Sequence, residues 1–265
     1  MKRPRPSGNG DVGTGTLGKA VAVLDVIAGS NKPLRFTDVL NLCDQPRGTL
    51  HRQLSNLVEE GLLVVHRDNS YGLGLRLMQL ASTAWASNQF RNVAAPHIQR
   101  LHAATGETVH LGVLRDADVI YLDKIESQQN IRMVSQIGNT APAYCTGVGK
   151  AALSALPDNE LHARLQQAVF RKFTPNTLMD LPAVLAEIAL IRETGNAFDR
   201  EEHEMGIVCV AAPVQAADKG LAAGVSVTGP AYRMTPQVLD SFAGITREIA
   251  AAIMTAIAVQ LSPRG

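Results

Sequence analysis

Residues 45–63 read QPRGTLHRQLSNLVEEGLL, and this stretch decides the fold of the first part of the chain. Leu50, Leu54 and Leu57 recur at helical spacing, which predicts an amphipathic helix that begins near Pro46. The opposite side of this helix carries short polar side chains and cations, and no acid occurs before Glu59. Such a side is either an ordinary solvated helix surface or a surface that meets phosphates and base edges.

The neighbouring residues give this helix its context. Leu17, Val21, Leu24 and Ile27 form the apolar stripe of an earlier helix. A short second helix is expected over residues 38–42, with Thr37 as its N-cap. After the third helix, residues 62–73 predict a strand, a polar turn at residues 67–70 and a second strand. Three helices followed by a hairpin is the order of a winged helix-turn-helix domain.

The charge of the chain supports a local nucleic-acid surface and excludes a general polycation. The net charge is +1, whereas residues 1–57 hold eight Lys and Arg against four Asp and no Glu. The three cysteines are far apart and form no CxxC pair, which is typical of a reducing compartment. No apolar run resembles a signal peptide or a membrane span. We therefore expect a soluble cytoplasmic protein without membrane association, whose residues 1–16 form a disordered tail.

The second half of the chain follows a different pattern. A linker helix is expected over residues 76–95, between a first domain at residues 17–75 and a second at residues 96–265, where Pro96 starts another helix. Beyond Gly106, β-type runs at residues 107–137 precede helical segments, and two more strands and a final helix over residues 236–259 follow. Strands, then helices, then strands predict an α+β domain with an antiparallel sheet.

Both halves resemble a known family. TLHRQLSNLVEEGLLVVHRDNSYGLG (residues 49–74) resembles the recognition helix and wing of the IclR family of bacterial transcriptional regulators. GETVHLGVL, VGKAALSALP, IRETGNAFDREEHEMGIVCVAAPV and GVSVTGP resemble landmarks of that family's GAF-like effector-binding domain. The resemblance covers residues 17–260 and implies a DNA-binding regulator, by family habit a repressor. It also implies a homodimer or homotetramer, double-stranded operator DNA as partner, and a small organic acid or aromatic catabolite as effector.

The resemblance also implies which residues contact each ligand. The residues expected to meet DNA are Arg47, Thr49, His51, Arg52, Arg67 and Asn69. The residues expected to line the effector site are Met133, Gly147, Val148, Asp199, Cys209, Ser226 and Thr228. Apolar walls, hydroxyls, backbone donors and one acid suit a small polar molecule such as a carboxylate. The chain departs from the family at the start of the recognition helix, where Gly48 replaces the Ser of the usual Ser-Thr pair, so its base preference there is open.

Several other interpretations of the second half stay open. YCTGVGKAA (residues 144–152) fails as a phosphate-binding loop, because Tyr144 replaces the first Gly and Ala151 the Ser or Thr. Its glycines either offer backbone donors to a carboxylate or serve only the geometry of a turn. Residues that could form a Cys-His-Asp nucleophilic set or a metal site are His110, Asp199, His203 and Cys209. The spacing of these residues does not require either site, so we expect no catalytic residue, metal or cofactor. The alternative function that the sequence leaves open is a small-molecule-metabolising enzyme with an N-terminal interaction module.

Overall fold

A computed structural model describes residues 15–129 and 135–261 of the chain. The chain divides into two compact units between Ser87 and Asn88. Each unit has a hydrophobic core of its own.

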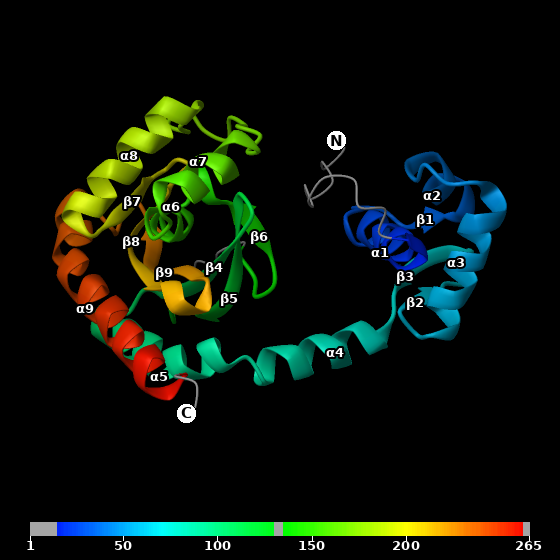
Figure 1. The fold of residues 1–265 in the computed structure, drawn as a ribbon, viewed down its shortest axis with the longest axis horizontal. Coiled ribbons are helices and arrows are strands. Elements are labelled where there is room, and N and C mark those ends of the chain that lie inside the picture. The colour runs from blue at the N-terminus through cyan, green and yellow to red at the C-terminus, as the bar shows by residue number, and fades with distance from the viewer. Residues whose placement is uncertain (1–14, 130–134, 262–265) are drawn as a thin grey trace. The chain divides into compact units, whose positions relative to one another are not determined.

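The first unit contains the predicted helices and hairpin (Figure 1). Its elements are α1 (Gly15–Ala28), β1 (Leu34–Arg35), α2 (Phe36–Leu42), α3 (Arg47–Glu59), β2 (Leu63–Val65), β3 (Ser70–Leu73) and α4 (Leu75–Ala86). The three strands form an antiparallel sheet in the order β1-β3-β2. Val23, Val39, Leu50 and Leu54 are fully or almost fully buried where α1, α2 and α3 pack together. The apolar stripe of residues 45–63 therefore faces this core, as its spacing predicts.

The start of α2 corrects one prediction. Thr37 does not cap the helix, because α2 already begins at Phe36 and Arg35 takes the N-cap position. The backbone N–H of Arg35 donates to the Asp38 carboxylate at 2.9 Å, which is half of a capping-box arrangement. The two residues of β1 were not predicted, because so short a strand has no measurable period.

The second unit is built on a six-stranded antiparallel sheet in the order β6-β5-β4-β9-β8-β7. The strands are β4 (Thr108–Arg115), β5 (Asp118–Ile125), β6 (Thr140–Pro142), β7 (Ala197–Arg200), β8 (Ile207–Ala216) and β9 (Leu221–Pro230). The α+β class with an antiparallel sheet is thus confirmed. The edge strands β6 and β7 were not predicted, and they are the two shortest strands of this sheet.

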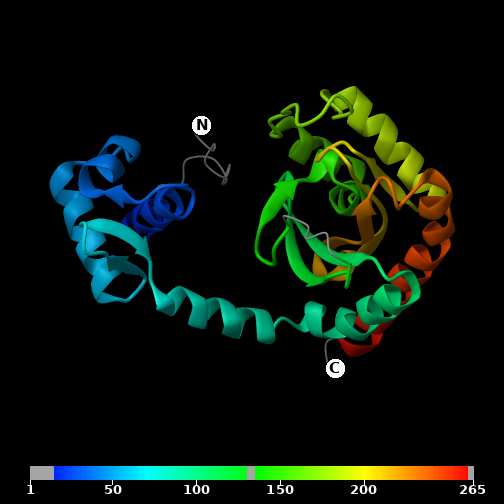
Figure 2. The ribbon, with the colours of Figure 1, turned by 180° about the vertical axis from the view of Figure 1, so that it is seen from behind.

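Helices cover both sides of this sheet, which curls around α6 (Figures 1 and 2). The helices are α5 (Gln89–Thr105), α6 (Gly147–Ser154), α7 (Asp158–Gln166), α8 (Leu181–Thr194) and α9 (Pro236–Gln260). On one side α5 and α9 pack on the sheet through residues such as Val109, Val227 and Ile253. By length and composition α9 would also suit a membrane span, but its buried residues pack on β8 and belong to this core. On the other side α6 and α8 enclose a second cluster that includes Leu153 and Ile188.

Two further predictions need correction or lie outside the described residues. Pro96 does not start a helix, because α5 begins at Gln89 and Pro96 lies inside it. The Asn88 side chain caps α5 by accepting from the Arg91 N–H at 2.9 Å, a signal that the proline obscured. Met133, with most of the strand predicted over residues 131–137, lies outside the described residues.

Candidate functional site

The outer side of α3 is polar and cationic. Arg47, His51 and Arg52 are exposed, and Thr49 is half-buried on the flank of the apolar stripe. The first turn of α3 contains no acid. Among the described residues, no ion pair involves a cation of α3. These charges are therefore uncompensated and available to an anionic partner.

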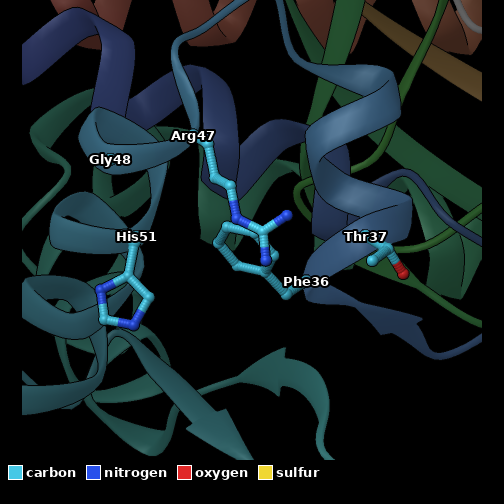
Figure 3. A pocket seen from close by; sticks show the side chains of 5 residues that line it. All are labelled: Phe36, Thr37, Arg47, Gly48 and His51. Atoms are coloured by element: carbon cyan, nitrogen blue, oxygen red, sulfur yellow. The ribbon is translucent and has the colours of Figure 1, made fainter.

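A hollow lies between the first turns of α2 and α3 (Figure 3). Its volume is about 640 Å³. Five residues line it: Phe36, Thr37, Arg47, Gly48 and His51. The Arg47 guanidinium carbon lies 5.3 Å from the centre of the Phe36 ring, and the His51 ring centre lies 6.0 Å from that ring. A Cβ added at Gly48 would meet no atom within 4 Å, so packing does not require a glycine there.

The turn between β2 and β3 presents Arg67 and Asn69, both of which are exposed. Asn69 has a φ of 61°, a left-handed conformation that Asn tolerates better than most residues. The Asp68 carboxylate accepts from the N–H of Ser70 at 3.1 Å and from its hydroxyl at 2.6 Å. These bonds hold the turn in one shape, with two side chains free for a partner.

The second unit gathers a polar group of residues on the α6 side of its sheet. Asp199 pairs with Cys209, and Cys209 with Thr228, so the three form a row across β7, β8 and β9. Ser226 pairs with His110 on β4. We call the residues His110, Asp199, Cys209, Ser226 and Thr228 the polar cluster; all five are buried. Four of them are among the residues expected to line the effector site, and α6 brings two more, Gly147 and Val148, to the same side.

Gly147 lies in close contact with the polar cluster. A Cβ added there would come within 2.3 Å of the Cys209 Sγ and 3.5 Å of the Asp199 backbone nitrogen. A Cβ at Gly149 would likewise come within 2.4 Å of the Ala143 Cα. Close packing therefore accounts for both glycines without a ligand, which is the geometric alternative that the sequence left open.

His110 is the cluster residue that sequence reasoning did not assign to the effector site. Its Nδ1 lies 3.2 Å from the Thr228 Oγ1 and its Nε2 lies 2.8 Å from the Ser135 Oγ. Burial, assisted by the charge of Lys124, lowers the pKa of His110 to about 3. The imidazole is therefore neutral at pH 7, with one nitrogen that donates and one that accepts. A histidine in an otherwise apolar strand was the available signal.

Asp199 and Cys209 both have a raised pKa. Burial, and then the negative charge of Glu202, raise the pKa of Asp199 to about 7. Burial raises the pKa of the Cys209 thiol to about 12, so it is a weak nucleophile at neutral pH. The ring of His110 bonds to hydroxyls and not to this thiol. The described residues contain no group of three or more His, Cys, Asp or Glu suited to a metal ion.

Lys150 anchors α6 to the segment that follows β7. Its ammonium group is fully buried and lies 2.5 Å from a carboxylate oxygen of Glu202 and 3.3 Å from one of Glu187. Glu202 in turn donates its backbone N–H to the Asp199 carboxylate at 2.7 Å. No role was predicted for Lys150 from the sequence, and this buried ion pair was missed.

Comparisons with known proteins agree over both units. The IclR helix-turn-helix domain matches residues 16–67, and the domain described as bacterial transcriptional regulator IclR C-terminal matches residues 83–255. The transcriptional repressor AllR of Escherichia coli K12 is 28% identical over 254 residues, 95% of this chain and 93% of AllR. The Thermotoga maritima IclR structure is 30% identical, with a TM-score of 0.68 over 91% of this chain and 97% of that one.

One similar structure contains a small molecule. It is an IclR homologue from Microbacterium hydrocarbonoxydans in complex with 4-hydroxybenzoate. It is 22% identical to this chain, with a TM-score of 0.75 over 92% of this chain and 100% of that one. At this identity the likeness shows a shared fold.

Proposed function

Because this chain belongs to the IclR family of bacterial transcriptional regulators, we propose that α3 and the β2–β3 turn bind operator DNA and that a small organic acid bound at the polar cluster changes this binding. The related AllR proteins are named as repressors, and the same sign of control is proposed here. The rival function, a metabolising enzyme, does not agree with this family of regulators. Because a bacterial repressor binds DNA in the cytoplasm, a cytoplasmic location is part of this proposal.

The DNA-binding part rests on the cations of α3. Arg52 lies in the middle of the exposed side, where an arginine can donate two hydrogen bonds to the O6 and N7 of guanine. Arg67 and Asn69 in the turn would meet the flanking backbone or groove. One short helix supplies only a few base contacts, each of roughly 1–3 kcal/mol. Two copies that read two half-sites are therefore needed, and a homodimer or a homotetramer satisfies this need.

The effector part rests on one observation, the convergence of the polar cluster with the start of α6. Thr228 and Ser226 bring hydroxyl groups, and His110 brings a neutral ring. Asp199 in its protonated form can donate to a carboxylate, whereas an ionised Asp199 would repel it. An organic acid therefore suits this cluster, and the 4-hydroxybenzoate held by a similar structure is an example of the class.

The test compares acids with their own amides. The purified chain is titrated with 4-hydroxybenzoate and other small organic acids, and with the matching amides, while thermal unfolding and DNA binding are followed. An effector acid should raise the melting temperature and change DNA affinity, and its amide should do neither. Thr228→Val should weaken the response to the acid without changing DNA affinity in its absence. Equal responses to acid and amide, or an unchanged response in Thr228→Val, would remove the carboxylate from the proposal.

A further inference from the structure

Arg47 contacts an aromatic ring and forms no ion pair with any acid in the part of the chain that the structure describes. Figure 3 shows its side chain reaching from the start of α3 so that the guanidinium lies against the ring of Phe36, at the start of α2. Phe36 is half-buried and packs against the core of the first unit, which fixes the ring. The Asp38 carboxylate, two residues further along α2, accepts a hydrogen bond from the backbone N–H of Arg35.

This contact keeps the guanidinium ordered and leaves its hydrogen-bonding edges unoccupied. An ion pair would order an arginine but also neutralise it, whereas a ring that covers one face leaves the N–H groups at the edge free. An arginine that is already ordered loses less side-chain freedom when it binds. The contact therefore prepares Arg47 for an anion with a planar, bidentate fit, such as a phosphate.

The position of the contact indicates which part of DNA it meets. In a helix-turn-helix the second helix enters the major groove and the first helix crosses the sugar-phosphate backbone. The Arg47 guanidinium lies at the start of α2, the first helix of this pair. The Thr37 hydroxyl and the His51 ring line the same hollow and can also donate to phosphate oxygens.

We propose that Phe36 is a positioning residue that holds Arg47 across the hollow, where Arg47, with Thr37 and His51 beside it, binds a phosphate of the DNA backbone. This inference rests on the proposed DNA-binding function and gives two arginines of α3 different roles in it. Arg47 supplies affinity that does not depend on sequence, and Arg52 supplies the preference for particular bases.

A double-mutant cycle on DNA of arbitrary sequence tests this division, because phosphate contacts need no operator. Wild type, Phe36→Leu, Arg47→Ala and the double variant are titrated onto a mixed-sequence duplex across a salt series, with fluorescence anisotropy as the readout. Phe36→Tyr keeps a ring at position 36. Arg100→Ala removes one charge from α5 in the other unit and controls for net charge. Thermal unfolding of each variant shows whether it is folded.

Arg47→Ala should reduce the slope of log affinity against log salt by about 0.9 for each bound chain, the value for one phosphate contact. Phe36→Leu should weaken binding by about twofold to fivefold, as expected for the loss of an exposed cation–π contact, and should add almost nothing in the Arg47→Ala background. Phe36→Tyr and Arg100→Ala should match wild type.

Two results would overturn the inference: an unchanged salt slope in Arg47→Ala, or effects of Phe36→Leu and Arg47→Ala that add in the double variant. If Phe36→Leu does not fold, the slope of Arg47→Ala and the affinity of Phe36→Tyr still decide the matter. A wild-type chain without salt-dependent binding would contradict the proposed function itself, which is a distinguishable failure.

Discussion

Gly147→Ala should disturb the polar cluster and little else. The added methyl carbon would lie 2.3 Å from the Cys209 Sγ, whereas non-bonded heavy atoms prefer about 3.5–4.0 Å. The sulfur must therefore move by more than about 1 Å. Cys209 is almost fully buried and its strand is hydrogen-bonded on both sides, so it has little freedom to do so.

The expected cost follows from this overlap. Overpacking of a closed core by one methyl group costs about 1–3 kcal/mol. The better helix propensity of Ala recovers at most about 1 kcal/mol of this. For a unit of this size, each kcal/mol of lost stability lowers the melting temperature by roughly 2–4 °C. A fall of a few degrees, with a weaker effector response and unchanged effector-free DNA affinity, is the expected outcome.

Thermal unfolding by circular dichroism measures this cost, and two further variants locate its origin. Gly244→Ala in α9 is the matched control, because a Cβ there meets nothing within 4 Å; it should be neutral or slightly stabilising. In a Cys209→Ala background the sulfur is gone, so Gly147→Ala should cost markedly less. A cost that is the same with and without the Cys209 sulfur, or a stabilising Gly147→Ala, would refute the argument.

Three other changes test the remaining parts of the structure. The pKa of Asp199 is raised from 3.8 to about 7, so the folded state binds this proton more tightly than the unfolded state does, and the free energy of unfolding should fall as pH rises from about 4 to 7. Denaturant unfolding across this pH range should show a smaller fall in Asp199→Asn. An identical fall in wild type and Asp199→Asn would contradict the assignment. Lys150→Met should lower the free energy of unfolding by about 3–5 kcal/mol, because it leaves the carboxylates of Glu202 and Glu187 without their buried partner. Chemical denaturation should show that adding Glu202→Leu restores part of this lost stability. Gly48→Ala should raise the stability of the first unit by up to about 1 kcal/mol, measured by thermal unfolding, and a destabilised variant would show that the space beside Gly48 is not open.

The first unit could be predicted well because its signals are local. Leu50, Leu54 and Leu57 follow one another at helical spacing, and the structure buries all three. The exposed positions of Arg47 and Arg52 follow from the same period. The errors concern the ends of helices. Arg35 and not Thr37 is the N-cap of α2, because the position of the cap depends on where the backbone enters the helix and not on which side chain prefers that position.

In the second unit, the contacts between residues that are distant in the sequence could not be predicted. Within the polar cluster, four residues come from four different strands and meet only through the pairing of β4, β9, β8 and β7: His110, Thr228, Cys209 and Asp199. The resemblance to a family indicated three of these residues, but it did not indicate His110 or its bond to Thr228. The buried pairing of Lys150 with Glu202 likewise depends on tertiary packing, which has no period in the sequence.

The most direct test is a selection of DNA fragments from the genome that encodes this chain, with wild type and Arg52→Ala, in the absence and presence of small organic acids. The proposed recognition by α3 predicts that wild type enriches one near-palindromic sequence, that an acid changes this enrichment, and that Arg52→Ala loses the preference while it keeps salt-dependent binding to any duplex. If wild type enriches no sequence under any of these conditions, or if Arg52→Ala enriches the same sequence as strongly, α3 does not read the operator.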